Sequence, residues 1–132
     1  MFEGVDHVVI AVADLENAVA QYEKIFDVEV GGRGEPPGET YRNAIFRFPE
    51  TMVELISPKS EEGPVARRLG VAGDGVYLVA MRVDDLDATV AKLRQQGVRL
   101  IGDPGEGNAV TGQLFIHPSE SSGVLVQLVE RR

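Results

Sequence analysis

Two histidines and a set of carboxylates are the residues of this chain whose types could support metal or acid–base chemistry. The chain has no cysteine, which excludes disulfides, thiolate zinc sites, iron–sulfur clusters and cysteine nucleophiles. A metal site would therefore take its ligands from His7, His117, carboxylates and amide oxygens. The net charge of −8 argues against a surface that follows nucleic-acid phosphates, which needs clustered Lys and Arg.

The elements that must position these residues belong to an ordinary globular chain. Its 132 residues are 43% hydrophobic and 26% charged, which suits one compact domain and excludes the disordered class. The longest apolar run, residues 8–13, is far shorter than the roughly 20 residues that cross a bilayer. The acidic N-terminus lacks the basic region of a signal peptide. We therefore expect a cytoplasmic protein with neither a membrane nor a nucleic acid as partner.

An internal repeat organises the chain. Residues 5–20 align with residues 76–91 at a shift of 71, and seven of the 16 positions are identical. In both copies an apolar run is followed by an aspartate, Asp14 or Asp85, that suits a helix N-cap, and then by an apolar stripe at helical spacing. The repeat predicts two half-length copies of one unit rather than two independent domains.

Each copy predicts the element order βαβββ. A short helix over 64–69, begun by Pro64 and closed by Gly70, is expected to bridge the copies. This gives an α+β fold in which two modules, about 1–60 and 74–132, form one domain (1–132) with a helical linker at 61–73. After the first strand and the helix of each copy, the strand candidates are 28–32, 41–48 and 52–57, then 98–101, 112–117 and 124–129.

Strand parity predicts which side chains share a face. In the first strand Val8, Ile10 and Val12 should pack on the helix, which leaves His7 on the opposite face. By the same alternation, Glu54 shares a face with Met52 and Ile56, and Gln127 shares a face with Leu125 and Val129. Two such sheets with helices on the outer side would make a curved mixed sheet, a cup, whose concave face carries His7, Glu54 and Gln127.

Several segments together follow the pattern of one known family, and they are residues 5–12, the helix start at 14–15, residues 52–58, residues 83–86 and the ending FIHP…GVLVQL at 115–128. Through them the chain resembles the vicinal oxygen chelate superfamily, the group of glyoxalase I, extradiol dioxygenases, bleomycin-resistance proteins and methylmalonyl-CoA epimerase. The resemblance covers nearly the whole chain and is greatest to the epimerase branch, through the ending. It implies the cup-shaped fold and a small-molecule substrate or ligand bound in the cup.

The resemblance also implies a site for a divalent metal (Co, Ni, Mn, Zn or Mg) and no organic cofactor. His7 and Glu54 match the ligand positions of the first module, and Gln127 matches the last ligand position of the second. The remaining position falls on Leu78, which cannot coordinate a metal. Glutamine supplies an oxygen but no charge, so the site is degenerate and its affinity should be low.

For the activity, the epimerase branch implies abstraction of a proton next to a small acyl group or thioester. The branch's base falls on Glu39 when the chain is aligned on Phe46. The electrophile that stabilises the enolate would be His7, Tyr41 or an arginine such as Arg47. Tyr41, Arg47, Leu78 and His117 are the candidate substrate contacts, and a hydrogen-bonded turn histidine is an equal reading of His117.

Two other functions remain open beside this epimerase-like or lyase-like enzyme. One is a metal-free small-molecule binding protein of the bleomycin-resistance type, which the missing ligand at Leu78 favours. The other is a module that serves protein association and keeps the cup as a relic. Whether the chain is an enzyme stays open at this point. Because members of the superfamily usually pair, and each copy offers an open sheet edge, we also expect a homodimer.

Overall fold

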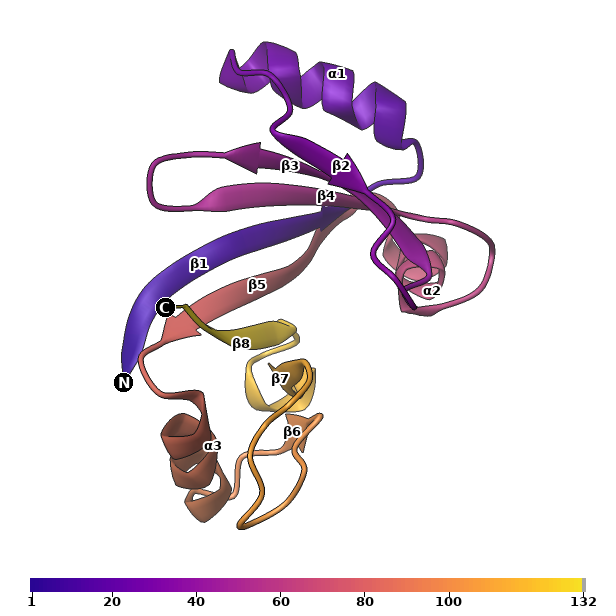
Figure 1. Cartoon of the computed structure of the whole chain (residues 1–132). Coiled ribbons are helices and arrows are strands. Elements are labelled where there is room, and N and C mark those ends of the chain that lie inside the picture. The colour runs from indigo at the N-terminus through magenta and orange to yellow at the C-terminus, as the bar shows by residue number, and fades with distance from the viewer. Residues whose placement is uncertain (132) are drawn as a thin grey trace. The chain divides into compact units, whose positions relative to one another are not determined.

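The computed structural model describes residues 1–131 and has an α+β architecture (Figure 1). The order βαβββ occurs twice with a helix between the copies, as the repeat predicts. A 3₁₀ turn at Pro118–Glu120 lies in the last connection. The elements are β1 (Phe2–Ala11), α1 (Leu15–Phe26), β2 (Gly32–Gly34), β3 (Tyr41–Arg47), β4 (Met52–Pro58), α2 (Pro64–Ala72), β5 (Gly75–Val83), α3 (Leu86–Gln95), β6 (Leu100–Ile101), β7 (Leu114–Ile116) and β8 (Val126–Glu130).

The chain divides into two compact units. The first unit is His7–Tyr77, and the second comprises Met1–Asp6 together with the chain from Leu78 onward. Strand β1 therefore contributes its beginning to the second unit and its end to the first. The modules that the sequence predicts, about 1–60 and 74–132, describe the repeated element order, and their organisation as one domain stays a prediction.

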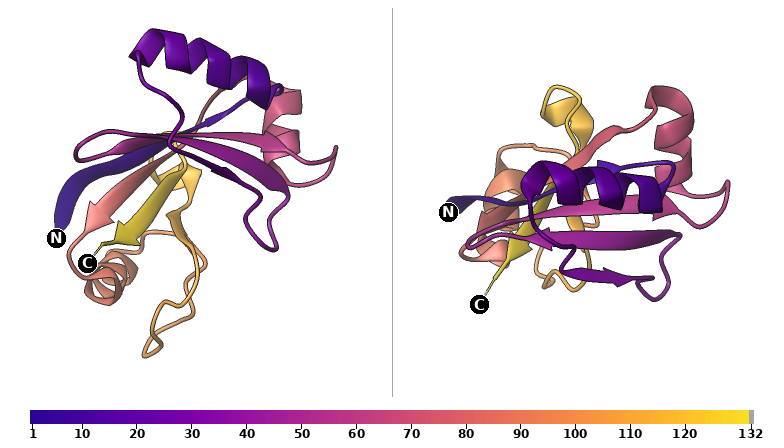
Figure 2. Two further views of the ribbon diagram at one scale, coloured as in Figure 1. Left: turned by 45° about the horizontal axis from the view of Figure 1, so that its top comes forward. Right: turned by 90° about the horizontal axis from the view of Figure 1, so that it is seen from above.

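The sheet of the first unit has the order β2-β3-β4-β1. Strands β1 and β4 are parallel, with His7 opposite Met52 and Val9 opposite Glu54. Strands β3 and β4 are antiparallel, and Ile45 lies opposite Glu54. Helix α1 lies along one face of β2, β3 and β4 (Figure 2). The mixed strand directions and the helix on one face agree with the expected fold class.

The core of the first unit lies between α1 and the sheet. It buries Val12, Ala18, Val19, Ala44, Phe46 and Leu55, with Ile10 packed against them. The strand parity read from the sequence is therefore confirmed for Ile10 and Val12. The ring of Phe46 makes an edge contact with Phe26, at a centroid distance of 5.5 Å. These contacts fix the face that β3 and β4 turn toward α1, and hence the face that they turn away from it.

Helix α1 begins where the sequence predicts. The side chain of Asp14 accepts a hydrogen bond of 3.0 Å from the backbone N–H of Asn17. The helix ends at Asp27, which adopts the left-handed conformation with φ of 55°. The strand that follows differs from the prediction, because it lies at Gly32–Gly34 rather than at 28–32. Pairing with β3, which no local signal reports, determines that position.

Helix α2 also differs from the sequence prediction at its end. It begins at Pro64 as expected, yet it continues through Gly70 to Ala72. Gly73, with φ of 71°, ends the helix by donating its N–H to the carbonyl of Leu69 at 2.9 Å. A glycine inside a helix costs about 1 kcal/mol relative to alanine, which the surrounding packing can offset. Gly70 was therefore the wrong stop signal and Gly73 the right one.

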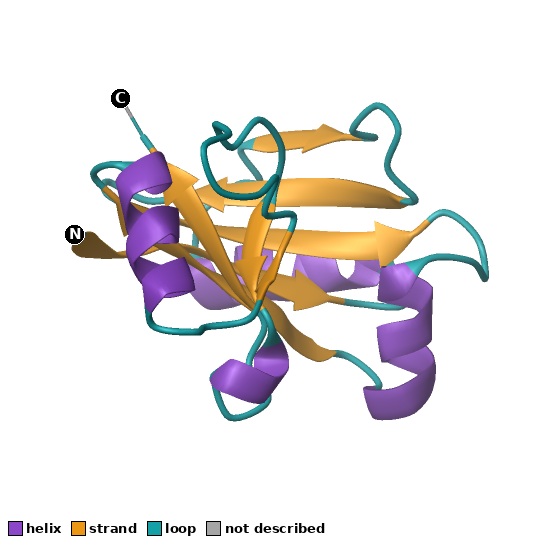
Figure 3. Cartoon of the chain, turned by 90° about the horizontal axis from the view of Figure 1, so that it is seen from below, coloured by secondary structure: helices purple, strands orange, loops and turns teal. Residues whose placement is uncertain are grey.

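The sheet of the second unit has the order β1-β5-β8-β7-β6. Strands β5 and β8 are parallel, and Ala80 lies opposite Gln127. Helix α3 packs against this sheet through Val90, which contacts a core containing Leu114 and Leu128. The side chain of Asp85 accepts from the N–H of Ala88 at 3.0 Å, so the second predicted N-cap is also confirmed. Figure 3 distinguishes the helices of both units from their strands.

A buried carboxylate holds the edge of the second unit. Asp6 is 4% exposed and accepts hydrogen bonds from Arg82, at 3.0 Å, and from Arg131, at 2.8 Å. The carboxylate raises the pKa of Arg131, chiefly through this hydrogen bond.

None of the helices in the described part of the chain has the length and apolar character that a membrane-spanning helix needs.

Candidate functional site

The face of the first unit that turns away from α1 carries half of the predicted site residues. Because Ala44 and Phe46 are buried under α1, alternation along β3 places Tyr41, Asn43 and Arg47 on the opposite face. Glu54 on β4 lies on this face too, opposite Ile45 of β3 and Val9 of β1. The structure thus assembles a polar row across β3, β4 and β1.

His7 and Glu54 form the centre of this row. The Nε2 atom of His7 lies 3.9 Å from Oε1 of Glu54, and the side chains are 7% and 15% exposed. Asn43 donates a hydrogen bond of 3.0 Å from Nδ2 to the other carboxylate oxygen, Oε2. A hydrogen bond to a charged acceptor holds a side chain more firmly than a neutral one does. The Glu54 carboxylate is therefore fixed between an imidazole and an amide.

Asn43 is a site residue that the sequence reasoning missed. The signal was available, since β3 was predicted over 41–48 and parity alone places Asn43 on the same face as Tyr41. What the sequence does not contain is the register of β3 against β4. That register brings Asn43 opposite Ile56, one diagonal step from Glu54.

Tyr41 begins β3 and lies near two carboxylates. Burial raises the pKa of Tyr41 to about 12, and the charges of Glu39 and Glu54 add to the increase. Tyr41 is therefore a neutral phenol at physiological pH and can donate a hydrogen bond to an oxygen that gains negative charge. This electrostatic neighbourhood brings Glu39, the candidate base, to the same end of β3 as Tyr41.

Tyr77, at the end of the first unit, joins the same neighbourhood. Burial raises the pKa of its phenol, the charges of Arg67 and Arg68 on α2 lower it, and Glu39 raises it. The raised pKa keeps Tyr77 protonated near neutral pH, so a second neutral donor lies within the electrostatic reach of Glu39. Tyr77 is not among the site residues that the sequence predicts.

Arg47 is not brought to this end of the site. It ends β3 opposite Met52, six residues from Tyr41, and a strand rises about 3.3 Å per residue. The two residues are therefore separated by about 20 Å along the strand. The exposed side chain of Arg47 runs beside Gly31, where a Cβ would meet its Cγ at 3.4 Å. Any contact of Arg47 with a substrate would be remote from Tyr41 and Glu39.

The second unit holds the other predicted residues. Gln127 on β8 lies opposite Ala80 of β5 and Phe115 of β7. Because its neighbour Leu128 is buried in the core with α3, Gln127 points to the face away from that helix. Leu78 is 6% exposed on β5. Val9 pairs with Glu54, and the residue 71 positions after Val9, Ala80, pairs with Gln127. The same shift of 71 makes Leu78 the equivalent of His7 in the second copy of the repeat.

His117 caps the 3₁₀ turn. Its Nδ1 accepts a hydrogen bond of 3.0 Å from the N–H of Ser119 and lies 2.7 Å from the hydroxyl oxygen of Ser119. These contacts match the description of a hydrogen-bonded turn histidine. They engage Nδ1 alone, so a substrate contact would have to use Nε2.

The donor set of the described residues does not fit a tightly held divalent cation. Across residues 1–131 no three or more His, Asp or Glu side chains lie together in a group that could hold a metal. His7 and Glu54 supply two donors, and Asn43 already occupies one of the two Glu54 oxygens. A third donor is missing at Leu78, whose side chain is a hydrocarbon. Divalent cations in mixed nitrogen and oxygen sites gain affinity from ligand number and charge, so these residues do not fit a tightly held ion.

Comparison with known proteins shows that the chain is similar to epimerases of one superfamily. Residues 6–115 match the glyoxalase/bleomycin resistance protein/dioxygenase superfamily. An ethylmalonyl-CoA/methylmalonyl-CoA epimerase of Cereibacter sphaeroides is 35% identical, covering 97% of this chain and 98% of the relative. The mitochondrial methylmalonyl-CoA epimerase of Bos taurus is 32% identical, covering 93% of this chain and 71% of the relative.

Solved structures give the same result. A methylmalonyl-CoA epimerase from Mycobacterium tuberculosis superposes with a TM-score of 0.84 and 36% identity, covering 98% of this chain and 88% of that one. A variant of the Streptomyces coelicolor methylmalonyl-CoA epimerase in complex with 2-nitronate-propionyl-CoA superposes with a TM-score of 0.85 and 29% identity, covering 98% of both chains. The resemblance read from the sequence is confirmed for the superfamily and for its epimerase branch. The chain therefore belongs to the glyoxalase/bleomycin resistance protein/dioxygenase superfamily.

Proposed function

We propose that this protein is an acyl-CoA epimerase that acts on 2-alkylmalonyl thioesters. The single observation that carries the proposal is the full-length similarity, at 35% identity, to a protein named ethylmalonyl-CoA/methylmalonyl-CoA epimerase. A solved relative bound to 2-nitronate-propionyl-CoA supports the same class of substrate. The reaction is inversion at the carbon between the thioester carbonyl and the carboxylate.

The proposed chemistry begins with removal of the proton from that carbon. The C–H bond breaks, the proton passes to a carboxylate base, and the electron pair moves into an enolate whose charge rests on the thioester oxygen. Reprotonation on the opposite face of the planar enolate restores the C–H bond with inverted configuration. The protein must supply a base, a donor for the enolate oxygen and an acid on the second face.

Glu39 is the proposed base and Tyr41 the proposed donor. The raised pKa of Tyr41, about 12, keeps its phenol protonated in the range where a carboxylate base is ionised. The charge of Glu39 contributes to that pKa, which supports placing the two groups on one substrate. Arg47, Leu78 and His117 stay proposed substrate contacts, and His7, Glu54 and Gln127 stay the positions proposed for a weakly bound metal. Because the donor set does not fit a resident cation, no step is assigned to a metal.

Deuterium incorporation tests the proposal directly. Methylmalonyl-CoA incubated with the protein in D₂O should gain deuterium at carbon 2, as followed by NMR. Glu39→Gln should slow incorporation by about 100-fold or more, the usual contribution of a general base. Glu29→Gln, an exposed acid of the same unit, is the matched control. Equal incorporation by Glu39→Gln and the wild type would remove Glu39 from the mechanism, and none by the wild type would refute the epimerase.

Tyr41→Phe examines the proposed donor. Loss of one donor to a developing oxyanion costs about 100-fold in kcat when the donor is preorganised. The phenylalanine keeps the ring and so keeps its packing at the start of β3. A rate within threefold of the wild type would exclude Tyr41 from stabilising the enolate.

The alternative function is a metal-free binding protein of the bleomycin-resistance type. The observation that favours it is the hydrocarbon side chain of Leu78 at a repeat position of His7, which removes a metal ligand. The deuterium-incorporation experiment separates the two functions, because a binding protein would bind acyl-CoA or another small molecule without catalysing the exchange of the proton at carbon 2. The homodimer and the cytoplasmic location stay predictions, and sedimentation analysis would measure the first.

A further inference from the structure

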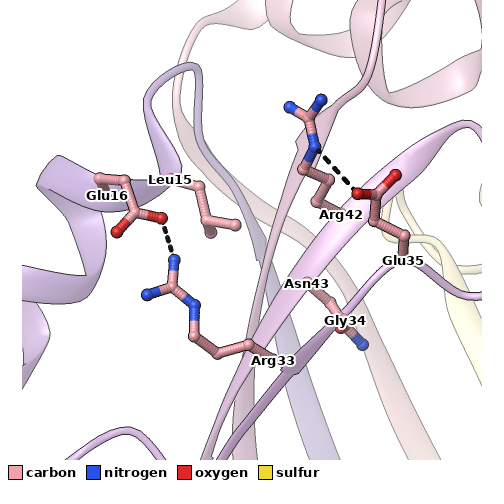
Figure 4. A pocket seen from close by; sticks show the side chains of 7 residues that line it. All are labelled: Leu15, Glu16, Arg33, Gly34, Glu35, Arg42 and Asn43. Atoms are coloured by element: carbon pink, nitrogen blue, oxygen red, sulfur yellow. Dashed lines mark hydrogen bonds and ion pairs between the residues drawn. The ribbon is translucent and has the colours of Figure 1, made fainter.

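A charged hollow lies on the face of the first unit opposite His7 and Glu54. It has a volume of about 390 Å³ and is lined by the first turn of α1, by β2 and the residue after it, and by β3 (Figure 4). Arg33 pairs with Ala44, a core residue under α1, so Arg33 points to the α1 side, and alternation puts Arg42 on the same side. The side chains that line it are those of Leu15, Glu16, Arg33, Glu35 and Arg42, and the chain at Gly34 and Asn43 completes the wall.

Two arginines and two glutamates line the hollow, and one further cation, Lys59, lies beside it. Arg33 forms an ion pair with Glu16, and Arg42 and Lys59 share the single carboxylate of Glu35. The charges of the lining side chains therefore balance, and Lys59 adds one positive charge at the border, whereas the whole chain has a net charge of −8. Local positive charge is what an anionic ligand needs in order to approach an acidic protein.

The ion pairs of Glu35 are easy to exchange, whereas Arg33 is hydrogen-bonded to Glu16. Both contacts of Glu35 are 3.7 Å long, beyond hydrogen-bond length, and the Arg42 and Glu35 side chains are 51% and 57% exposed. Exposed ion pairs of this kind stabilise a fold by about 0–1 kcal/mol. A phosphate offers a guanidinium two parallel hydrogen bonds and up to two negative charges, which a single shared carboxylate does not.

We propose that this hollow binds the phosphate groups of a coenzyme A thioester, through Arg33 and Arg42. This inference rests on the proposed function and names the part of the substrate that the hollow recognises. The diphosphate and the 3′-phosphate of coenzyme A are the anions concerned, and the acyl end would lie on the face of His7 and Glu54.

The edge of the sheet connects the two faces. Strand β2 is the edge strand, and Gly32 and Gly34 flank Arg33 without side chains that would block passage. A Cβ built at Gly32 would meet no atom within 4 Å, so the edge is open there. Two strand spacings, about 10 Å, separate β4 from β2. The flexible pantetheine arm of coenzyme A is long enough to cover that span around the edge.

Calorimetric titration with coenzyme A tests the site. The double variant Arg33→Gln/Arg42→Gln should bind coenzyme A at least tenfold more weakly, because charge-assisted hydrogen bonds are lost. Glu35→Gln should bind more tightly, since a competing carboxylate is removed. Lys24→Gln, in the last turn of α1, is the matched control for a change of one exposed positive charge. Binding by the double variant within twofold of the Lys24→Gln control would overturn the proposal.

Further arms identify which phosphates are bound. If the 3′-phosphate occupies the hollow, 3′-dephospho-coenzyme A should bind more weakly to the wild type, and the double variant should narrow that difference. If the diphosphate occupies it, both compounds should lose affinity equally in the double variant. Inorganic phosphate that binds as tightly as coenzyme A would indicate a free-phosphate site and overturn the assignment. The folding of each variant is checked by its thermal unfolding temperature.

A kinetic arm separates failure of this site from failure of the proposed function. For deuterium incorporation, the wild type should prefer methylmalonyl-CoA over the methylmalonyl thioester of pantetheine, which has no phosphates. That preference in kcat/KM should shrink at least tenfold in the double variant. If the wild type incorporates deuterium and the double variant keeps the same preference for methylmalonyl-CoA, the phosphate site is overturned but the epimerase function is not. If coenzyme A binds through the arginines but no deuterium is incorporated, the epimerase function is overturned but the phosphate site is not.

Discussion

The burial of Phe46 allows a quantitative prediction for the first unit. Its side chain on β3 is fully buried, and its ring lies 5.5 Å from Phe26 and 6.4 Å from Tyr22. Phe46→Ala removes the ring from the core and leaves a cavity, at a cost of about 4 kcal/mol in the free energy of unfolding. Phe46→Leu refills much of the volume but loses both ring pairs, at a cost of about 1.5 kcal/mol.

These free energies translate into thermal shifts. For 132 residues, an unfolding entropy of about 2.1 cal/mol/K per residue gives roughly 280 cal/mol/K, so 1 kcal/mol lowers Tm by about 3.6 °C. We expect Tm to fall by about 14 °C in Phe46→Ala and by about 5 °C in Phe46→Leu, as measured by scanning calorimetry. Urea titration followed by circular dichroism would measure the free energies independently.

Phe48→Ala is the matched control. Phe48 is only partly buried and makes its ring contact with Phe26 alone, at 5.2 Å. It should therefore lose clearly less stability than Phe46→Ala. Equal losses for the two variants, or a loss below about 2 kcal/mol for Phe46→Ala, would refute the assignment of Phe46 to the centre of this core.

Three further predictions follow from single interactions. The folded chain holds the Tyr41 phenol proton to about pH 12, whereas an unfolded tyrosine releases it near pH 10, so the free energy of unfolding should fall between these values. Tyr41→Phe should flatten that fall and remove a tyrosinate step near pH 12 from an ultraviolet titration. Asp6→Ala should lower the free energy of unfolding by about 2 kcal/mol, which is less than the loss of a fully buried ion pair, because Arg82 and Arg131 are partly exposed and are hydrated in the variant. Urea denaturation would measure this change, and an unchanged free energy of unfolding would contradict the prediction. Asp85→Ala should cost about 1 kcal/mol through its N-cap, and an unchanged urea midpoint would count against that role.

Much of the fold could be predicted because its signals are local or repeated. The two N-caps depend on residues three positions apart, and both bonds are present, Asp14 to Asn17 and Asp85 to Ala88. The internal repeat at a shift of 71 predicts that the element order βαβββ occurs twice, without any knowledge of tertiary contacts. Errors arose where a nonlocal partner decides the outcome, as in the position of β2, which follows from its pairing with β3.

The candidate site divides along the same line. Strand parity placed His7 and Glu54 on the face away from α1, because side chains alternate along a strand whatever lies beside it. The hydrogen bond from Asn43 to Glu54 and the closeness of Tyr41 to Glu54 depend on the register between strands. That register cannot be read from the sequence alone.

Taken by itself, the sequence determined the repeated βαβββ order and the helix starts. It also determined that the site has few metal ligands, since Leu78 lacks a donor atom in any conformation. The tertiary structure alone decided which polar groups meet. Asn43 and Glu54 are 11 residues apart, and Arg33 and Glu16 are 17 apart. Such pairs form only when strand register and helix packing bring distant segments of the chain together, and those are properties of the whole fold rather than of any local pattern.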